Sequence, residues 1–335
     1  MEGSKKVAIL HNEVSAESSA DELDVLDQVN AVSASLKELG YVPETIPVSL
    51  NLQKTSDKLK SINPLFAFNL FESFESTGKF IYFVPALLDH LKIPYTGSGT
   101  DEIFITTNKI ITKEYLEKAG LPTPKWSSVE KIIASNGDFP FPCIIKPVWE
   151  DASVGLDSES VFKDFTSLKK HFRQNTASGR ELFAEEFIDG REFNISVLAS
   201  PNGPQVLPQA EIEFIDFPDG KPKIVGYRAK WDENSFECKN TVRIFRKSDE
   251  DEDLFARLFE LSLKCWKLFN LCGYVRVDFR VRKNGQPEIL EINANPCISP
   301  DSGFVAACKT AGINYTEMIK RIVEDISGLN KELRY

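Results

Sequence analysis

The chain has 335 residues, which is enough for two or three modest domains with a sizeable core. Its formal net charge of −10 argues against a nucleic-acid partner, because such a partner requires a broad basic surface. No apolar run approaches the roughly 18 residues of a membrane span, and no secretory leader pattern is present, so we expect a cytoplasmic protein without a membrane partner. The six cysteines lack Cys-x-x-Cys spacing and are expected to be reduced, mostly core residues.

The N-terminal third alternates strands with helices. Residues 6–10 predict a strand that breaks at His11 and Asn12. A helix ending at Gly40 follows, with apolar positions at helical spacing: Leu23, Leu26, Val29, Val32 and Leu36. Strand-like segments at 45–48 and 65–71 and a helix near 83–91 complete the unit. This βαβ pattern predicts a parallel sheet, whose ligands lie beyond the carboxyl ends of the strands.

Two further units follow. A helix over 108–119 begins the second, which continues with a strand at 141–146, a polar loop at 149–155, a helix near 160–172 and a strand at 181–187. The third is strand-rich through 206–214, 224–231 and 274–293, and a helix over 315–326 closes it. The acidic run 249–253 predicts a helix N-terminus capped by Ser248 or Asp249. We therefore expect an α/β unit over 1–104, a central unit over 105–188 and an α+β unit over 189–330.

The most informative segment is 274–293, where two alternating runs flank Asn284-Gly285, a strong hairpin-turn signal. If those two residues form the turn, Lys283 pairs with Gln286 and the register follows by counting. One face then pairs Arg276 with Asn293 and Asp278 with Glu291, and the other pairs Val277 with Ile292 and Phe279 with Leu290.

The polar face of this hairpin carries hard oxygen donors of the kind Mg²⁺ selects, from Asp278, Glu291 and Asn293. Arg276 beside them could hold a phosphate through a bidentate fork. The alternative is a solvated sheet face with a surface ion pair of little energetic value.

Two other segments suggest a nucleotide. Lys146 ends a strand, and the loop 151–155 after it can turn backbone N–H groups toward an anion; an exposed lysine beside a flexible turn is the alternative. The connector 185–188 ends the next strand and can offer backbone groups to an adenine edge, with Glu192 positioned for ribose hydroxyls.

The order of these features resembles the ATP-grasp superfamily, and within it the D-alanine–D-alanine ligases and related carboxylate–amine ligases. The resemblance covers nearly the whole chain and rests on Asn108-Lys109, Lys146-Pro147, the 185–192 connector, Lys230, and Arg276-Val-Asp278 paired with Glu291-Ile-Asn293. It implies an ATP-grasp fold behind an N-terminal parallel-sheet domain. It also implies that ATP converts a carboxylate into an acyl phosphate, which an amine then attacks to form an amide or peptide bond.

The resemblance implies a role for each matching residue. Lys109 and Lys146 would bind the α- and β-phosphates beside Ser153, and Lys230 the γ-phosphate. Glu185, Glu186, Phe187 and Ile188 would surround adenine, and Glu192 the ribose. Asp278, Glu291 and Asn293 would hold two Mg²⁺ ions, for which Mn²⁺ can substitute, and Arg276 would stabilise the transferred phosphoryl group. A segment at 217–225 would form a lid.

The amino-acid site departs from the family pattern. Asp24 stands near the acidic residue expected to hold the first amino group, and Ser302 keeps the serine for a C-terminal carboxylate. Trp231 replaces a tyrosine, Ala152 a serine, and Glu72 and Glu75 lie in a loop expected to carry a histidine. Cys297 and Asp301 take the usual glycine and histidine positions; the Cys297 backbone N–H would serve as oxyanion donor, with a nucleophilic thiol as the minor alternative. Because Glu72, Glu75 and Asp301 add negative charge near the acceptor site, we expect a basic or bulkier amino acid or peptide rather than a D-alanine pair.

Two alternatives stay open at this point. A kinase of a small carboxylate or polyol would stop after phosphoryl transfer, and a catalytically silent nucleotide-binding protein would not react at all. The expected partners are small amino-acid or peptide substrates, and the resemblance leads us to expect a homodimer.

Overall fold

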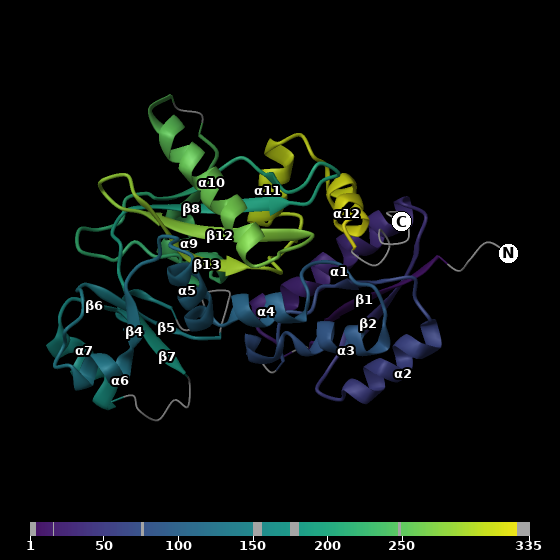
Figure 1. Ribbon diagram of the computed structural model, residues 1–335, viewed down its shortest axis with the longest axis horizontal. Coiled ribbons are helices and arrows are strands. Elements are labelled where there is room, and N and C mark those ends of the chain that lie inside the picture. The colour runs from purple at the N-terminus through teal and green to yellow at the C-terminus, as the bar shows by residue number, and fades with distance from the viewer. Residues whose placement is uncertain are drawn as a thin grey trace.

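The computed structural model describes residues 5–15, 17–74, 77–149, 156–174, 181–246 and 249–326. Within that part, three β-sheets follow one another along the chain, and helices cover them (Figure 1). The expected unit boundaries at 104/105 and 188/189 stay predictions. No helix in the described ranges combines the length and apolar content needed to cross a bilayer.

The N-terminal sheet is parallel, as predicted. Strand β1 (Lys6–Asn12) lies between β2 (Val42–Val48) and β3 (Ala67–Asn69), with helices α1 (Ala20–Glu38), α2 (Leu52–Ile62) and α3 (Phe83–Leu91) around it. The predicted break at His11 is wrong, because β1 stays paired with β2 through Asn12. At the carboxyl end of β1, Asn12 Oδ1 accepts the Glu72 N–H at 2.8 Å and so fixes the loop that follows β3.

The buried face of α1 also differs from the prediction. Val29, Val32 and Leu36 are buried as expected, but Leu23 and Leu26 are each 38% exposed. Val25 takes their place in the core, because successive residues point about 100° apart around a helix and only one stripe can face the sheet.

The second sheet is antiparallel in the order β4-β7-β5-β6. Its strands are β4 (Trp126–Ser128), β5 (Cys143–Pro147), β6 (Val161–Phe162) and β7 (Leu182–Glu186), and α6 (Val129–Ala134) and α7 (Phe165–Gln174) share its core. Helix α7 therefore begins later than residue 160. Helices α4 (Thr100–Thr107) and α5 (Lys109–Lys118) connect the first sheet to this one, and Asn108 caps α5.

The third sheet is antiparallel in the order β11-β10-β8-β12-β13, and β9 (Gln205–Val206) pairs with β8. The other strands are β8 (Arg191–Leu198), β10 (Ala210–Phe214), β11 (Thr241–Ile244), β12 (Tyr274–Val281) and β13 (Pro287–Asn293). The strand predicted over 224–231 is wrong. Strands β10 and β11 pair with each other, and the chain between them contains the short helices α8 (Tyr227–Trp231) and α9 (Phe236–Asn240).

The acidic run begins a helix, as predicted, although the cap differs. Asp249–Asp251 form a 3₁₀ turn, and Asp251 is the N-cap of α10 (Glu252–Leu268), while Ser248 lies outside the described residues. All six cysteines are free.

The hairpin of β12 and β13 has the predicted register at its polar end. Arg276 pairs with Asn293 and Asp278 with Glu291, but Phe279 pairs with Ile289 rather than Leu290. The two-residue turn is wrong as well: the Arg282 N–H donates to Gln286 O at 2.8 Å, so 283–285 form a three-residue loop. The three-residue loop shifts the strand register by one residue relative to the prediction. A bulge at Leu290 reverses that shift, so the pairing is as predicted again from Asp278 and Glu291 onward. Leu290 consequently lines a cleft instead of joining the core.

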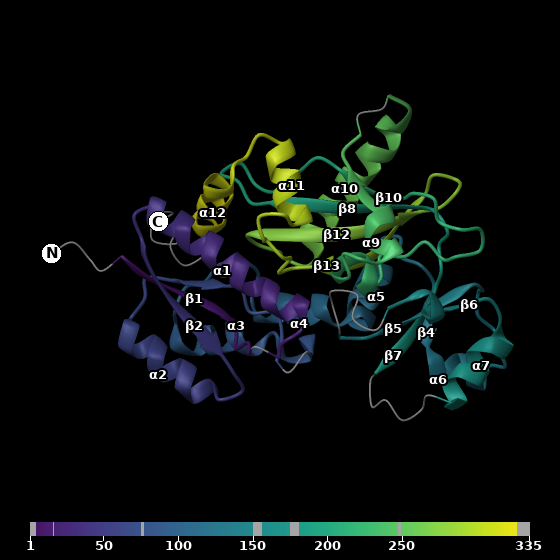
Figure 2. The same ribbon diagram turned by 180° about the vertical axis from the view of Figure 1, so that it is seen from behind.

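The end of the chain returns to its beginning. Helix α11 (Gly303–Thr310) leads to α12 (Tyr315–Glu324), which lies beside α1 in both views (Figures 1 and 2). Met318 and Ile319 share a core with Val29, Val32 and Leu36. Residues 297–299 also contact α1, where the Ile298 N–H donates to Gln28 Oε1 at 3.0 Å.

Candidate active site

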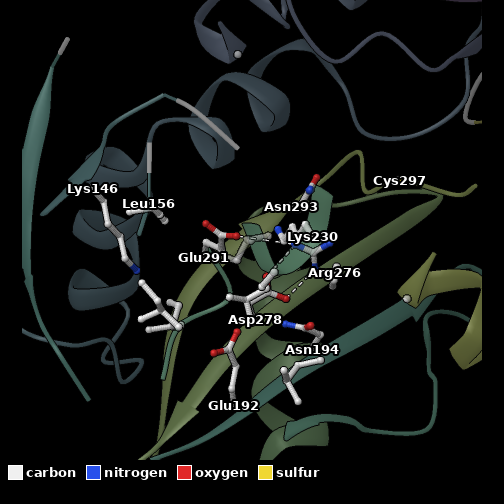
Figure 3. Close-up of a pocket in the computed structure, with 18 of the residues that line it drawn as sticks. Lys146, Leu156, Glu192, Asn194, Lys230, Arg276, Asp278, Glu291, Asn293 and Cys297 are labelled. Atoms are coloured by element: carbon white, nitrogen blue, oxygen red, sulfur yellow. Dashed lines mark hydrogen bonds and ion pairs between the residues drawn. The ribbon is translucent and has the colours of Figure 1, made fainter. Parts of the chain in front are cut away.

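A cleft of about 480 Å³ receives residues from the loops and strands of all three sheets. Figure 3 shows the part of it that lies between Lys146 of the second sheet and the hairpin of the third. Most of the residues predicted from the sequence line it: Asp24, Glu72, Lys146, Glu185, Glu186, Phe187, Ile188, Glu192, Lys230, Trp231, Arg276, Asp278, Glu291, Asn293, Cys297, Asp301 and Ser302. Lys109 reaches it through an ion pair to Glu291. Ser153, Ala152 and Glu75 lie outside the described residues.

The polar face of the hairpin forms the floor of this cleft. Arg276 binds Asp278 through two hydrogen bonds of 2.8 Å, and Lys109 Nζ lies 3.6 Å from Glu291 Oε2. Burial alone would raise the pKa of Glu291, but the charges of Lys109 and Arg276 together with other lysines lower it. Burial raises the pKa of Asp278, and Arg276 offsets only part of that effect.

The donors on this floor suit a hard divalent cation. Asp278 and Glu291 are direct cross-strand neighbours, and Asn194 pairs with Asp278 from the other side, in β8. Asn293 Oδ1 accepts the Asn295 N–H at 3.0 Å and keeps a second lone pair for a ligand. Two carboxylates and an amide oxygen fit Mg²⁺. Asn194 was missed because no sequence motif includes it.

A buried ion triad lies on the opposite side of the cleft. Lys146 Nζ lies 2.7 Å from Glu185 Oε1, and Lys113 pairs with the other oxygen of Glu185. Lys113 is fully buried and also donates to Thr123 Oγ1 at 2.9 Å. Burial lowers the pKa of Lys113, whereas the two lysines hold the pKa of Glu185 below its ordinary value against the opposing effect of burial.

Glu185 was expected beside adenine, but its nearest charged neighbours are two lysines. Both of its oxygens face lysines, so its first function in the fold is to neutralise them, and its contact with adenine stays a prediction. Sequence reasoning missed Lys113. The available signal was its spacing, because it lies one helical turn after Lys109 on α5.

Arg280 holds the predicted lid segment, and the sequence analysis missed it too. It pairs with Glu192, donates to Gly190 O at 3.0 Å, and donates to the Lys223 carbonyl. Its position two residues after Asp278 on the same strand face was the available signal. Lys221 fastens the same segment through Glu237, at 2.7 Å.

Lys230 extends into the cleft from α8, close to Arg276 and Asp278 (Figure 3). Its enclosure by the cleft walls and the charge of Arg276 lower its pKa, although its side chain keeps contact with solvent.

A second polar cluster joins α1 to the segment after β13. Asp24 accepts from Ser299 Oγ at 2.8 Å and from Cys297 Sγ at 3.0 Å. The Gln28 amide donates to Glu72 at 3.0 Å and to Asp24 at 3.4 Å. Glu72 therefore lies beside Asp24, the residue expected at the first amino group, and its expected contact with the acceptor stays a prediction.

The thiol of Cys297 is not activated. Burial raises its pKa, and the charges of Glu72 and Asp24 raise it further. A thiolate nucleophile at this position is therefore disfavoured.

Arg243, on β11, is a further cleft residue that the sequence analysis did not identify. No local pattern distinguishes Arg243 as a site residue, because it lies in a short alternating segment that contains other basic residues. It lines the cleft together with Asp301 and Ser302. Ser302 Oγ accepts the Val305 N–H at 3.3 Å and caps α11, which leaves the serine hydroxyl free to donate.

Comparison with known proteins identifies the family of this chain. Residues 115–324, more than half of the chain, match the family model described as D-ala D-ala ligase C-terminus. The chain belongs to the D-alanine–D-alanine ligase family. It is 31% identical to the D-alanine–D-alanine ligase of Aquifex aeolicus over 301 residues, which cover 88% of this chain and 92% of that protein. It is 29% identical over 301 residues to an uncharacterized protein, y4sG, of Sinorhizobium fredii, covering 88% and 86% of the two chains.

Solved structures of this family show the same fold. The D-alanine–D-alanine ligase of Bacillus anthracis complexed with ATP superimposes with a TM-score of 0.76 at 24% identity, over 98% of this chain and 99% of that one. The VanG D-Ala:D-Ser ligase of Enterococcus faecalis gives a TM-score of 0.71 at 17% identity, over 96% and 99%. The predicted ATP-grasp fold and the predicted class, an ATP-dependent carboxylate–amine ligase, are thereby confirmed at the level of the family.

Proposed function

We propose that this D-alanine–D-alanine ligase family member uses ATP to join the carboxylate of one amino acid or peptide to the amine of another, through an acyl phosphate. The observation that carries this proposal is the hairpin floor. Asp278 and Glu291 lie opposite each other, Arg276 lies between the strands' polar side chains, and Lys109 pairs with Glu291. Phosphoryl transfer depends on positioning and charge neutralisation, and this arrangement supports both.

The first step forms a bond between a carboxylate oxygen and the γ-phosphorus of ATP, and breaks the bond from that phosphorus to the β–γ bridging oxygen. ADP leaves with the electron pair. Arg276 and Lys230 would balance the negative charge on the transferred group, and Lys109 and Lys146 the charge on the remaining phosphates. Bound at Asp278, Glu291 and Asn293, Mg²⁺ would supply further neutralisation of phosphate charge.

In the second step the amine attacks the acyl carbon, and inorganic phosphate leaves with the oxygen that came from the carboxylate. The amine loses one proton as the amide forms, and the departing phosphate takes up that proton. The Cys297 N–H would stabilise the oxyanion of the tetrahedral intermediate. Asp24, fixed by Ser299 and Cys297, would bind the ammonium group of the first amino acid.

The substrate pair is proposed to differ from two D-alanines. Trp231 lines the cleft in place of a tyrosine and cannot accept a hydrogen bond through its indole N–H. Glu72 adds a second carboxylate next to Asp24 through Gln28. An added negative charge at this end supports a first amino acid that carries additional positive charge.

The test is a matrix of D- and L-amino acids and dipeptides with ATP and Mg²⁺, following ADP, phosphate and product mass. Asp278→Asn, which should need more Mg²⁺ than the wild type, serves as the low-activity control at limiting Mg²⁺. ADP with an amide product supports the ligase, and equal or better turnover of D-alanine alone would remove the proposed difference in substrate. A phosphorylated substrate without an amide would instead indicate the kinase alternative, and formation of AMP would overturn the acyl-phosphate scheme.

A further inference from the structure

We propose that Arg243 recognises a carboxylate on the acceptor amine, so that this enzyme requires an anionic acceptor. The inference rests on the proposed function and adds the residue that selects the second substrate. The shared chemistry is a carboxylate, which can be the α-carboxylate of the acceptor amino acid or a carboxylate on its side chain.

The first support is position. Arg243 lies in β11 and lines the cleft with Asp301 and Ser302. A Cβ atom added to Gly303 would meet Nε and Cζ of Arg243 at 3.3 and 3.4 Å. The guanidinium is therefore held directly against the residue that follows Ser302, whose hydroxyl is free to donate.

The second support is the availability of its donors. Among the described residues, Arg243 makes no hydrogen bond and no ion pair within 4.0 Å. The other two cleft arginines differ: Arg276 is bound to Asp278 and Arg280 to Glu192. A guanidinium has five N–H donors in a planar fork that matches a carboxylate. The guanidinium N–H donors of Arg243 are therefore available to an anionic ligand.

The third support is the charge around it. Burial lowers the pKa of Arg243, the positive charge of Arg276 lowers it further, and the negative charge of Asp301 opposes both effects. An anionic ligand between Arg243 and Ser302 would relieve the repulsion between the two arginines. At the Asp24–Glu72 cluster the cleft is negative, so its two ends suit opposite charges: an ammonium group at one and a carboxylate at the other.

The experiment compares the wild-type enzyme, Arg243→Gln and Arg243→Lys on matched acceptors: D- and L-alanine, the corresponding alaninamides, and D- and L-aspartate. The control is Arg246→Gln, which removes an arginine of the same segment that pairs with Glu213 and does not line the cleft. We expect Arg243→Gln to raise the KM for a carboxylate acceptor by about 10- to 100-fold, as for a charge-assisted hydrogen bond. The kcat and the KM for ATP should stay within about twofold, and Arg243→Lys should recover part of the loss.

The acceptors distinguish the two sources of the carboxylate. If Arg243→Gln raises the KM for alanine, and alaninamide is a poor acceptor for the wild type and both variants, Arg243 binds the α-carboxylate. If only aspartate is affected, it binds the side-chain carboxylate. Unchanged KM values for all acceptors, or a wild-type enzyme that prefers alaninamide, would overturn the inference.

A binding measurement separates this inference from the proposed function. If no amide forms with any substrate pair, the proposed function fails, and the thermal shift given by alanine, aspartate or alaninamide in the presence of ADP and Mg²⁺ still tests Arg243. A shift that requires the carboxylate in the wild-type protein and disappears in Arg243→Gln supports the inference. The same shift in both proteins, or no shift with any carboxylate, overturns it.

Discussion

Glu185→Gln removes the counter-ion of two lysines and should destabilise the protein strongly. Glu185 is 1% exposed and Lys113 is fully buried, with Thr123 as its remaining hydrogen-bond partner. Lys146 lines the cleft, where solvent can hydrate its ammonium group, so the cost falls mainly on Lys113. Loss of one partner from a buried pair costs about 3–5 kcal/mol, which we expect as the decrease in the free energy of unfolding at pH 7.

Urea titration followed by circular dichroism measures this decrease. Glu181→Gln is the matched control, because Glu181 pairs with Lys79 at an exposed position and should contribute less than about 1 kcal/mol. The double variant Lys113→Met/Glu185→Gln should be more stable than Glu185→Gln alone, because it no longer buries an unpaired ammonium group.

The dependence on pH supplies an independent check. Burial lowers the pKa of Lys113 below 10.5, and Glu185 opposes that shift. Without Glu185 the folded protein binds the Lys113 proton more weakly than the unfolded chain does. The unfolded state then binds more protons, so the stability of Glu185→Gln should rise between neutral pH and 10.5 and approach that of the wild type. A variant within 1 kcal/mol of the wild type at pH 7 and with the same pH profile would refute the account of the triad.

Three further predictions concern the cleft and its hairpin. Cys297→Ser should keep kcat within about threefold, because the thiol pKa is raised and the proposed donor is the backbone N–H; a thousandfold loss in steady-state kinetics would indicate thiol chemistry instead. Gly285→Ala should lower the free energy of unfolding by about 1 kcal/mol, since φ at this position is +80°, and an unchanged urea midpoint would mean that the loop can rearrange. Asp278→Asn should raise the Mg²⁺ concentration needed for half-maximal phosphate release by at least about tenfold, and an unchanged Mg²⁺ titration would exclude Asp278 as a ligand.

The sequence predicted the site to the extent that local patterns specify it. Alternation around Asn284-Gly285 was sufficient to pair Asp278 with Glu291. The prediction missed one residue in the loop and one in the bulge, and these two errors in the register cancel. Alternation could not reveal the bulge, because an inserted residue leaves no mark in a run of apolar side chains. Residues 224–231 were expected to be a strand because they have apolar and aromatic side chains, but β10 pairs directly with β11 and the connection between them contains helix α8.

Residues that act through long-range contacts escaped the sequence analysis. In the sequence, Lys113 is indistinguishable from an exposed helix lysine. Its pairing with Glu185 depends on the packing of α5 against the second sheet, which no local pattern specifies. Arg243 gains its position only when β11 and the segment after β13 meet at the cleft. Glu72 was expected near the acceptor site, and its link to Asp24 escaped the sequence analysis because that link depends on Gln28 of α1.

The central claim is that the substrate carboxylate is phosphorylated before the amide forms, and isotope transfer tests it most directly. The first amino acid, identified from the substrate matrix, is labelled with ¹⁸O in its carboxylate, and the released phosphate is analysed by mass spectrometry. The account predicts one ¹⁸O atom in each phosphate formed, because the acyl carbon–oxygen bond breaks when the amine attacks. Phosphate free of ¹⁸O, released together with an amide product, would contradict it.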